Sequence, residues 1–259
     1  DGKVISEKSL KSNYPNTYSY LLNERANLKG RDYFDNSNKA WFELWNQRNY
    51  NRFKVEKLIT LDNASKNSFA YDDSGFIGTT TTYSVVPKLD VPIFGLLGVL
   101  NSSLLNYYHK KNTIPQANGF YRYQKTFIKS FPLKDFYSNH NIYQIIGVLS
   151  KMIVSVLSFD YILNSHVPNS HIAQLFEEVI DAMVMELYFK EDFEKVGIEF
   201  TKYAERDFES IEGKSESEQI ESIHRAYQKL REKDNEIRNN LKLMDIKLAD
   251  IVMPIKAAK

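Results

Sequence analysis

The chain has 259 residues, 42% of them hydrophobic, with 34 basic and 33 acidic residues and no cysteine. A chain without cysteine has no disulfide scaffold, no cysteine nucleophile and no thiolate metal site. Gln144 and Lys151 interrupt the most apolar stretch, 142–159, before it reaches the roughly 20 apolar residues that a bilayer crossing needs, so we expect no membrane partner. Because the chain begins with Asp1 and not with a methionine, we also expect a piece of a longer polypeptide.

Net charge differs between the two halves of the chain. Residues 1–135 hold 19 basic and 12 acidic residues, whereas residues 136–259 hold 15 and 21. This asymmetry favours separate domains and gives the basic half a candidate polyanion as its partner. We therefore predict a basic domain over 1–136, a pair of helices packed on it over 137–190 and a long helical hairpin over 191–259.

The first 86 residues are predicted to be irregular, then helical, then extended. Ser37 is a suitable N-cap for a helix that would carry Trp41, Phe42 and Trp45 on adjacent turns. Residues 54–86 contain short runs of apolar and β-branched side chains separated by turn residues. This pattern predicts three or four strands.

Helices dominate the next part of the prediction. Leucines at helical spacing predict a helix over 93–108, and the looser alternation over 119–131 predicts a strand and a short helix or turn. Two apolar stripes then predict helices over 142–157 and 172–187. The fold class is therefore α+β, with a mixed sheet-and-helix domain followed by an all-α region.

A heptad pattern runs through the C-terminal region. One series of apolar residues at seven-residue spacing comprises Ile223, Leu230, Ile237, Met244 and Ile251. The other series comprises Ile220, Tyr227, Asp234, Leu241 and Leu248. Asp234 would weaken this seam or set its register. The pattern predicts a long helix that pairs with the preceding helix of the same chain, and self-association through a coiled coil is the alternative.

The stretch 91–134 combines basic and aromatic residues and contains no acidic residue. Its basic residues are Lys110, Lys111, Arg122, Lys125, Lys129 and Lys134, interleaved with Tyr107, Tyr108, Phe120, Tyr121 and Tyr123. Cations neutralise phosphates and aromatic faces stack on bases, so the combination favours nucleic acid over a membrane surface. The alternative is that the aromatic residues are core and the lysines form a solvated face. His109 is expected at the surface, where it could contact a phosphate.

The sequence lacks the common catalytic constellations. It contains no glycine-rich phosphate loop and no Asn-Pro-Pro-Tyr motif of an adenine methyltransferase. The spacing of His166 and His171 does not place them on one helical face for a zinc site. The carboxylates at 72–73 fit a turn, and those at 32–35 lack the nearby Glu-x-Lys of a nuclease core. We therefore expect a binding module without catalytic or metal-binding residues of its own.

A series of short motifs stands in order along residues 10–190. They are Tyr14-Pro15, Tyr20-Leu21, Arg25, Trp41-Phe42-Glu43-Leu44, Lys57-Leu58-Ile59, Ser68-Phe69-Ala70-Tyr71-Asp72, the 80–86 strand, Leu97-Gly98-Val99-Leu100-Asn101-Ser102, Gly119-Phe120-Tyr121-Arg122-Tyr123 and Phe131-Pro132-Leu133. Together they resemble the TaqI-like C-terminal specificity domain, the target recognition domain of adenine-specific DNA methyltransferases and of fused type IIG restriction-modification enzymes. The segment 176–189 resembles the helix that often follows in the fused enzymes.

The resemblance implies recognition of a specific double-stranded DNA sequence by a module that is not catalytic by itself. S-adenosylmethionine, Mg²⁺ and any methyltransferase or endonuclease activity would belong to upstream domains of the parent enzyme, in a prokaryotic cytoplasm. A helical protein-interaction scaffold is the alternative function, and a small nuclease with an unrecognised site is a third.

On this resemblance, basic residues would contact DNA phosphates and polar loop residues would contact base edges. The expected phosphate contacts are Arg48, Arg52, Lys66, Lys110, Lys111, Arg122, Lys125 and Lys129. The expected base contacts are Asn112, Gln116, Asn118 and Tyr121. Ordinary solvation of each lysine, and a plain turn at Asn118-Gly119, are the alternatives.

Overall fold

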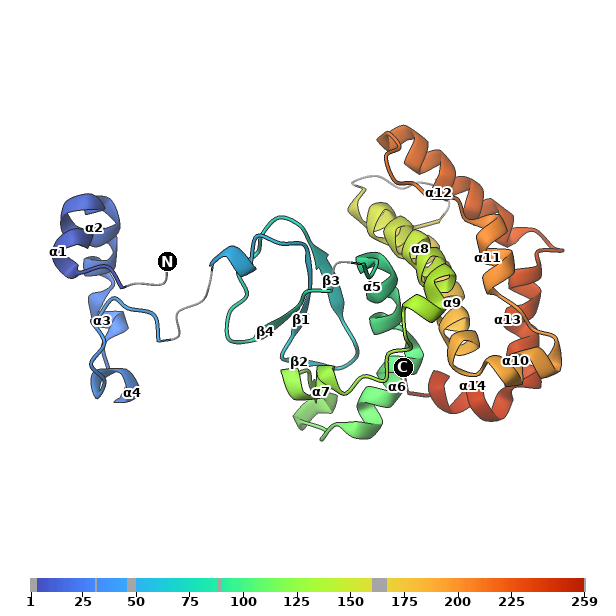
Figure 1. Cartoon of the computed structure of the whole chain (residues 1–259), viewed down its shortest axis with the longest axis horizontal. Coiled ribbons are helices and arrows are strands. Elements are labelled where there is room, and N and C mark those ends of the chain that lie inside the picture. Colours follow the sequence, from blue (N-terminus) through green and yellow to red (C-terminus); the bar gives the residue numbers. More distant parts are fainter. Residues whose placement is uncertain (1–3, 31, 46–49, 88–89, 160–166, 259) are drawn as a thin grey trace. The chain divides into compact units, whose positions relative to one another are not determined.

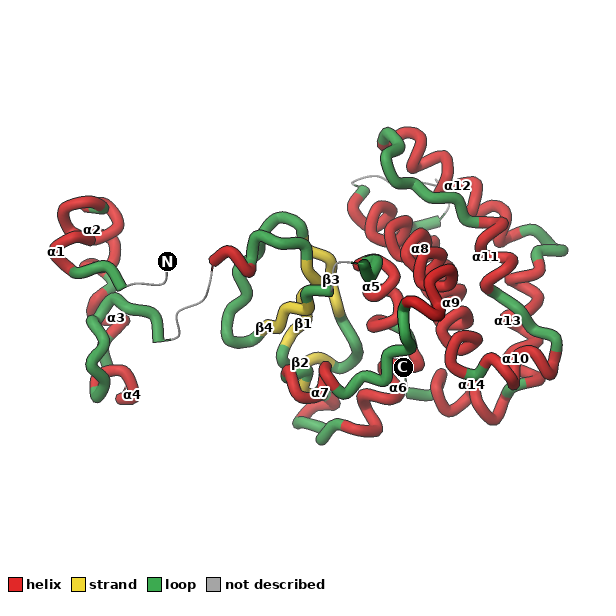
Figure 2. Tube along the Cα trace, viewed as in Figure 1, coloured by secondary structure: helices red, strands yellow, loops and turns green. Residues whose placement is uncertain are grey.

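The computed structural model describes residues 4–30, 32–45, 50–87, 90–159 and 167–258 (Figure 1). The chain forms two compact units, Asp1–Lys54 and Val55–Lys259. Helices predominate and the strands are few and short, all of them in the second unit (Figure 2). The fold is therefore α+β with a helical C-terminal region, as the sequence predicts.

Short helices make up the first unit. They are α1 (Glu7–Asn13), α2 (Pro15–Asn23), α3 (Arg25–Leu28), α4 (Asp32–Asp35) and η1 (Tyr50–Arg52). The helix predicted to carry Trp41 and Phe42 is wrong, because both residues lie in a turn. The Trp41 indole donates a 3.1 Å hydrogen bond to Glu7 and its ring lies 5.0 Å from the Arg25 guanidinium. These contacts to distant residues hold the tryptophan in a conformation that local helix propensity does not predict.

The second unit begins with short strands. They are β1 (Lys57–Leu61), β2 (Asn63–Ala64), β3 (Phe69–Asp72), β4 (Thr82–Val85) and β5 (Tyr121–Arg122). β1 lies between β3 and β4 and is antiparallel to both, while β2 and β5 form a separate antiparallel ribbon. A buried ion pair between Lys57 and Asp72 joins the ends of β1 and β3. Four of the five strands lie in 54–86, in agreement with the prediction.

Helices then follow one another to the middle of the chain. They are α5 (Ile93–Asn101), α6 (Ser103–Asn112), η2 (Ala117–Gly119), α7 (Lys125–Lys129), η3 (Tyr137–Asn139), α8 (His140–Ser158) and α9 (Asn169–Tyr188). The helices predicted over 142–157 and 172–187 are confirmed as α8 and α9. The single helix predicted over 93–108 is two helices, because Ser102 ends α5 and its hydroxyl caps α6 by accepting a hydrogen bond from the Leu105 N–H.

α5, α8 and α9 pack together in the centre of the unit (Figure 1). Two glycines of α5 permit the close approach of α8. A Cβ added at Gly95 would lie 2.4 Å from the Tyr143 carbonyl oxygen, and one added at Gly98 would lie 2.4 Å from a methyl of Ile146. Any larger residue at either position would therefore push the two helices apart.

By length and composition, the helical segment Tyr137–Ser158 could cross a membrane, contrary to the expectation from its sequence. Half of its most apolar window is nevertheless buried inside the molecule. Ile146, Leu149 and Val156 are fully buried, and α8 packs against α5 and α9. The apolar character of this segment is thus accounted for by its place in the core.

The C-terminal region folds into short helices. They are α10 (Lys190–Val196), α11 (Thr201–Asp207), α12 (Glu216–Arg231), α13 (Glu236–Lys247) and α14 (Ala249–Lys256). α12 packs on α8, α13 packs on α9 and α14 packs on α6. The long heptad helix of the prediction is therefore divided into α12, α13 and α14.

Asn235 explains the first division. Its side-chain oxygen caps α13 by accepting a 3.0 Å hydrogen bond from the Arg238 N–H, and its amide donates to the buried Asp207 carboxylate at 2.9 Å. Asp234 lies in the turn before this cap and not in a helical seam. Ile223, Ile237 and other apolar heptad residues are still buried, so the heptad pattern predicts core residues on both sides of the break in the helix.

One apolar core extends through the second unit, from Leu58 in β1 to Ile255 in α14. The core continues across residues 136 and 190, and the division of the chain at those residues stays a prediction. The C-terminal segment ends beside α6, where the Ala258 carbonyl accepts hydrogen bonds from Asn106 and Lys110 (Figure 1).

Candidate nucleic-acid interface

A hairpin, residues 113–120, connects α6 to β5 and is exposed from Ile114 onwards. The Gln116 N–H donates to the Phe120 carbonyl at 2.7 Å, and Pro115 pairs with Tyr121 across the hairpin. At the tip, Asn118 has a φ of 60° and Gly119 a φ of 73°. Asn and Gly adopt this left-handed conformation at little cost, which explains why the chain turns here.

The hairpin brings two of the predicted base contacts together. Gln116 and Asn118 are both exposed, with Gln116 at the start of the turn and Asn118 at its tip. Carboxamide side chains can donate and accept at once, which suits paired hydrogen bonds to a base edge. Asn112 lies before the hairpin, at the end of α6, where its side-chain amide donates to the Tyr108 carbonyl at 2.8 Å.

Two predicted phosphate contacts lie in the last turn of α6. A cation there interacts favourably with the helix dipole. The Lys111 side chain is exposed, and its amine lies 5.6 Å from the centre of the Tyr107 ring. The Lys110 amine, by contrast, donates to the Ala258 carbonyl at 2.6 Å and lies 5.6 Å from the centre of the Tyr121 ring. Lys111 is therefore the freer cation of the two.

Three further cations follow the hairpin. Lys125 and Lys129 are exposed and form the first and last residues of α7. Arg122 lies opposite Asn63 in the β2–β5 ribbon, and its guanidinium lies 3.1 Å from the Asp62 carboxylate. The sequence between 91 and 134 has no acid, but the fold supplies one from a neighbouring strand end. This ion pair reduces the positive charge at Arg122.

The interleaved aromatic residues do not form one exposed face. Tyr123 is fully buried, so its expected place on a DNA-binding surface is wrong. Tyr107, Tyr108 and Tyr121 are half-buried and pack against the core, whereas Phe120 is 41% exposed. The alternative stated above, that these aromatic residues are core, holds for Tyr123 and in part for the three half-buried tyrosines.

His109 is also interior, which corrects the expectation of a surface histidine. Its ring is 1% exposed, and Nδ1 lies 3.3 Å from the Thr113 hydroxyl. Burial lowers the pKa of His109 to about 4. The imidazole is therefore neutral near pH 7 and does not offer a positive charge to a phosphate.

The amides of Asn67, which is buried, and Asn101, which is exposed, hold the helices and the sheet in register behind the hairpin. The Asn67 side chain donates to the Leu100 carbonyl at 2.6 Å and accepts from the Tyr123 hydroxyl at 3.0 Å. The Asn101 amide bonds both the N–H and the carbonyl of Phe69, at 2.8 and 2.9 Å, along the outer edge of β3. The motif residues at 97–102 thus have a structural role, because they fix α5 against the sheet.

The second predicted basic group is divided between the two units. Lys66 is exposed between β2 and β3 and lines a groove of about 840 Å³ bordered by β3, α5, α6, α8 and α9. Arg52 is exposed in η1 of the first unit. Arg48 and His166 lie outside the described residues.

Ile114 is an exposed apolar residue of the hairpin that was not predicted from the sequence. It is 72% exposed, and Phe120, one of the interleaved aromatic residues, is 41% exposed. An apolar residue beside Pro115 in an otherwise polar loop was the available signal, because a large apolar side chain in a short polar turn is rarely covered. Within the described ranges, no three His, Asp or Glu side chains converge on a point where they could hold a metal ion.

Residues 1–133 match the family model of the TaqI-like C-terminal specificity domain. The matched half of the chain includes the sheet, α5, α6 and the hairpin. The chain belongs to this family. The hairpin and its neighbouring cations lie inside the matched segment.

Two type II methyltransferases are similar to the chain. M.BanIII of Aneurinibacillus aneurinilyticus is 26% identical over 147 residues, which are 54% of this chain and 25% of the relative. M.MjaIV of Methanocaldococcus jannaschii is 32% identical over 119 residues, which are 43% of this chain and 39% of the relative. The chain therefore spans well under half the length of each of these relatives.

Proposed function

We propose that this specificity domain recognises a defined sequence in double-stranded DNA on behalf of a restriction-modification methyltransferase. The observation that carries the proposal is the exposed hairpin 113–120, which presents two carboxamides between the cations of α6 and α7. Base edges in the major groove are recognised by such paired donors and acceptors, while lysine and arginine bind phosphates without regard to sequence.

The proposed roles follow from exposure and position. Gln116 and Asn118 contact base edges, with Asn112 and Tyr121 beside them. Lys111, Lys125 and Lys129 contact phosphates. Further phosphate contacts are Lys66, Lys110 and Arg122, of which Lys110 must release the Ala258 carbonyl and Arg122 must share its guanidinium with Asp62. Arg48 and Arg52 are proposed as phosphate contacts from the sequence alone.

The proposal includes a division of labour within a longer polypeptide. Upstream domains would bind S-adenosylmethionine, flip the target adenine and methylate it, and in a type IIG arrangement they would also hold Mg²⁺ and cleave. This chain would select the site and would not catalyse either reaction. Such an enzyme acts on DNA in the prokaryotic cytoplasm. The similarity to two type II methyltransferases supports this arrangement.

Equilibrium binding of the chain to duplex DNA over a range of salt concentrations, without added metal, tests the proposal. Replacing Lys111 and Lys125 by Ala should weaken the binding of all duplexes alike. It should also lower the magnitude of the slope of log K against log salt by about 0.9 for each phosphate that the variant no longer neutralises. The matched control replaces Lys190 and Lys195, two exposed lysines of α10, and should leave the slope unchanged. Equal slopes for both double variants would contradict the assigned phosphate-binding roles.

The same preparation distinguishes binding from catalysis. Incubation of the chain with duplex DNA and Mg²⁺ is expected to leave the DNA intact. Cleavage that EDTA abolishes would instead favour a complete nuclease. Absence of any salt-dependent duplex binding would favour the protein-interaction alternative.

A further inference from the structure

A cavity of about 330 Å³ lies between α9, α12 and α13, outside the residues that match the specificity family. Its apolar wall is formed by Leu175 of α9 and Leu241 of α13, which are both partly exposed. Val179 of α9 and Tyr227 of α12 also line the cavity, but they are almost completely buried and lie behind this accessible wall. The volume is near the lower end of the range found for small-molecule sites.

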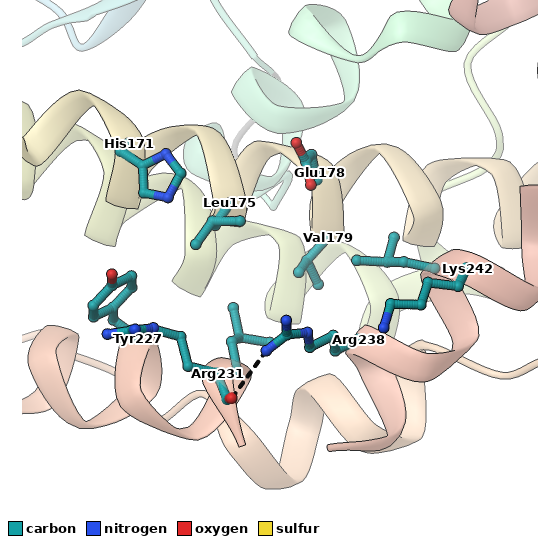
Figure 3. Close-up of a pocket in the computed structure, with 10 residues that line it drawn as sticks. His171, Leu175, Glu178, Val179, Tyr227, Arg231, Arg238 and Lys242 are labelled. Atoms are coloured by element: carbon teal, nitrogen blue, oxygen red, sulfur yellow. Dashed lines mark hydrogen bonds between the residues drawn. The ribbon is translucent and has the colours of Figure 1, made fainter. Parts of the chain in front are cut away.

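Three cations come from α12 and α13, across the cavity from Leu175 (Figure 3). Arg231 comes from the end of α12, and Arg238 and Lys242 come from α13. The Arg231 guanidinium lies 5.5 Å from the centre of the Tyr227 ring, and Arg238 donates a 2.9 Å hydrogen bond to the Arg231 carbonyl (Figure 3). These contacts orient both guanidinium groups without neutralising them.

Among the described residues, the three cations of the cavity form no ion pair with a carboxylate, and neither do Lys195, Lys233 and Lys247 of the same acidic region. Residues 136–259 contain 21 acidic and 15 basic residues, so carboxylates are plentiful. Elsewhere in this region Arg206, Lys229 and Lys256 form ion pairs with carboxylates at 3.1 Å or less. Glu178 is the one acidic residue among those that line the cavity.

An apolar wall facing unpaired cations selects for a particular ligand chemistry. Arginine binds carboxylate and phosphate groups through paired hydrogen bonds, and the three cations give the cavity a positive potential. A bare phosphate of a DNA backbone would leave the apolar wall unused. A phosphate or carboxylate attached to an apolar group would use both sides of the cavity.

We propose that this cavity is a binding site for a small organic anion that carries an apolar group, such as an aryl phosphate. Its anionic group pairs with Arg231, Arg238 and Lys242, and its apolar group packs on Leu175 and Leu241. The site is independent of the proposed DNA interface, since none of its residues belongs to the hairpin, α6 or α7.

Calorimetric titration of the 259-residue chain with phenyl phosphate tests the site, with inorganic phosphate as the matched probe that lacks the apolar group. Phenyl phosphate should bind saturably and at least about tenfold more tightly than inorganic phosphate, because only phenyl phosphate reaches the apolar wall. Equal binding of the two probes, or no saturable binding of phenyl phosphate, would overturn the proposal.

Variants locate the binding. Lys242→Gln removes one exposed cation and should weaken the binding of phenyl phosphate by about tenfold. Leu175→Trp should fill the cavity and abolish binding, with the thermal unfolding midpoint reporting that the chain still folds. Lys195→Gln, at an exposed lysine of α10, is the control and should bind as the parent chain does. Unchanged binding in Lys242→Gln would overturn the assignment.

A duplex oligonucleotide distinguishes the other source of phosphate. One outcome is that the duplex displaces phenyl phosphate and Lys242→Gln weakens the binding of the duplex. The cations are then part of a DNA contact, and the proposal of a small-molecule site is wrong. If the duplex binds without displacing phenyl phosphate, the two sites are separate, as proposed.

Discussion

The imidazole of His109 stacks on the ring of Tyr123, with ring centroids 4.1 Å apart and an interplanar angle of 24°. This contact joins the last turn of α6 to the residue that follows β5, at the two ends of the exposed hairpin. Phe131 closes the cluster edge-on, 5.5 Å from the imidazole. The hairpin proposed to contact bases is thus anchored at its base by buried rings, while its tip is free in solvent.

The His109 cluster predicts a loss of stability in mild acid. Burial lowers the pKa of His109 from 6.5 to about 4, so the unfolded chain binds a proton in this interval and the folded chain does not. The contribution to the free energy of unfolding is complete above pH 6.5 and is lost as the pH falls towards 4. Between pH 7 and pH 5 the expected loss is about 2 kcal/mol, measured by urea unfolding at both pH values.

Two variants assign this pH dependence. His109→Phe keeps an aromatic ring in the cluster but cannot titrate, so its stability should change less between pH 7 and pH 5. His140→Gln removes an exposed histidine and should behave as the parent chain does. The assignment fails if His109→Phe and the parent chain lose the same free energy.

Tyr123→Phe is expected to destabilise the fold although the ring is kept. The Tyr123 hydroxyl donates to the buried side-chain oxygen of Asn67 at 3.0 Å, and the variant deprives this oxygen of its donor. An unmet buried acceptor costs about 1–3 kcal/mol in the free energy of unfolding, measurable by chemical denaturation. Tyr137→Phe, at a tyrosine that is 70% exposed, is the control and should change stability by less than about 0.5 kcal/mol. Equal effects would show that burial of the hydroxyl does not matter.

Asn118→Gly separates the side chain from the backbone of the hairpin tip. Glycine adopts the φ of 60° found at this position, so the turn is kept while the carboxamide is removed. If Asn118 contacts a base, the variant should lose about 1–3 kcal/mol of binding free energy on the cognate duplex and almost nothing on random duplexes. Gln116→Ala should show the same selectivity. Equal weakening of cognate and random DNA in competition binding would exclude base contact for either residue.

Lys57→Met is expected to destabilise the second unit strongly. Burial by itself raises the pKa of the Asp72 carboxyl, but hydrogen bonds from Lys57, Ser74 and Phe76 outweigh it and hold this pKa below its ordinary value. Removing the buried cation leaves the carboxylate uncompensated, at a cost of about 3–5 kcal/mol. Lys190→Met, at a surface ion pair, is the control and should cost less than about 1 kcal/mol. Thermal or urea unfolding that does not distinguish these variants would contradict the prediction.

Local sequence patterns were sufficient to predict the helices and strands that follow a regular apolar period. The apolar stripes of α8 and α9 predicted both helices, and the strand-type runs predicted the strands between Lys57 and Val85. The motif series also indicated the specificity family, because motif order is a property of sequence alone. The turn at Asn118 followed from residue type as well, since Asn-Gly favours a left-handed backbone.

Long-range contacts decided the remainder. Trp41 lies in a turn because Glu7 and Arg25 bind its ring, and α12 ends before Asn235 because a distant carboxylate, Asp207, accepts from that amide. Periodicity records which residues are apolar, but not which partner covers them or where a helix must bend to reach it.

The amino-acid sequence by itself therefore determined the fold class, the family and the clustering of cations near the hairpin. Tertiary structure alone decided which of these groups are available. It buried His109 and Tyr123, paired Arg122 with Asp62, and left Gln116 and Asn118 in solvent. The physical reason is that exposure and charge pairing depend on segments far apart along the chain, and composition within one segment contains no information about them.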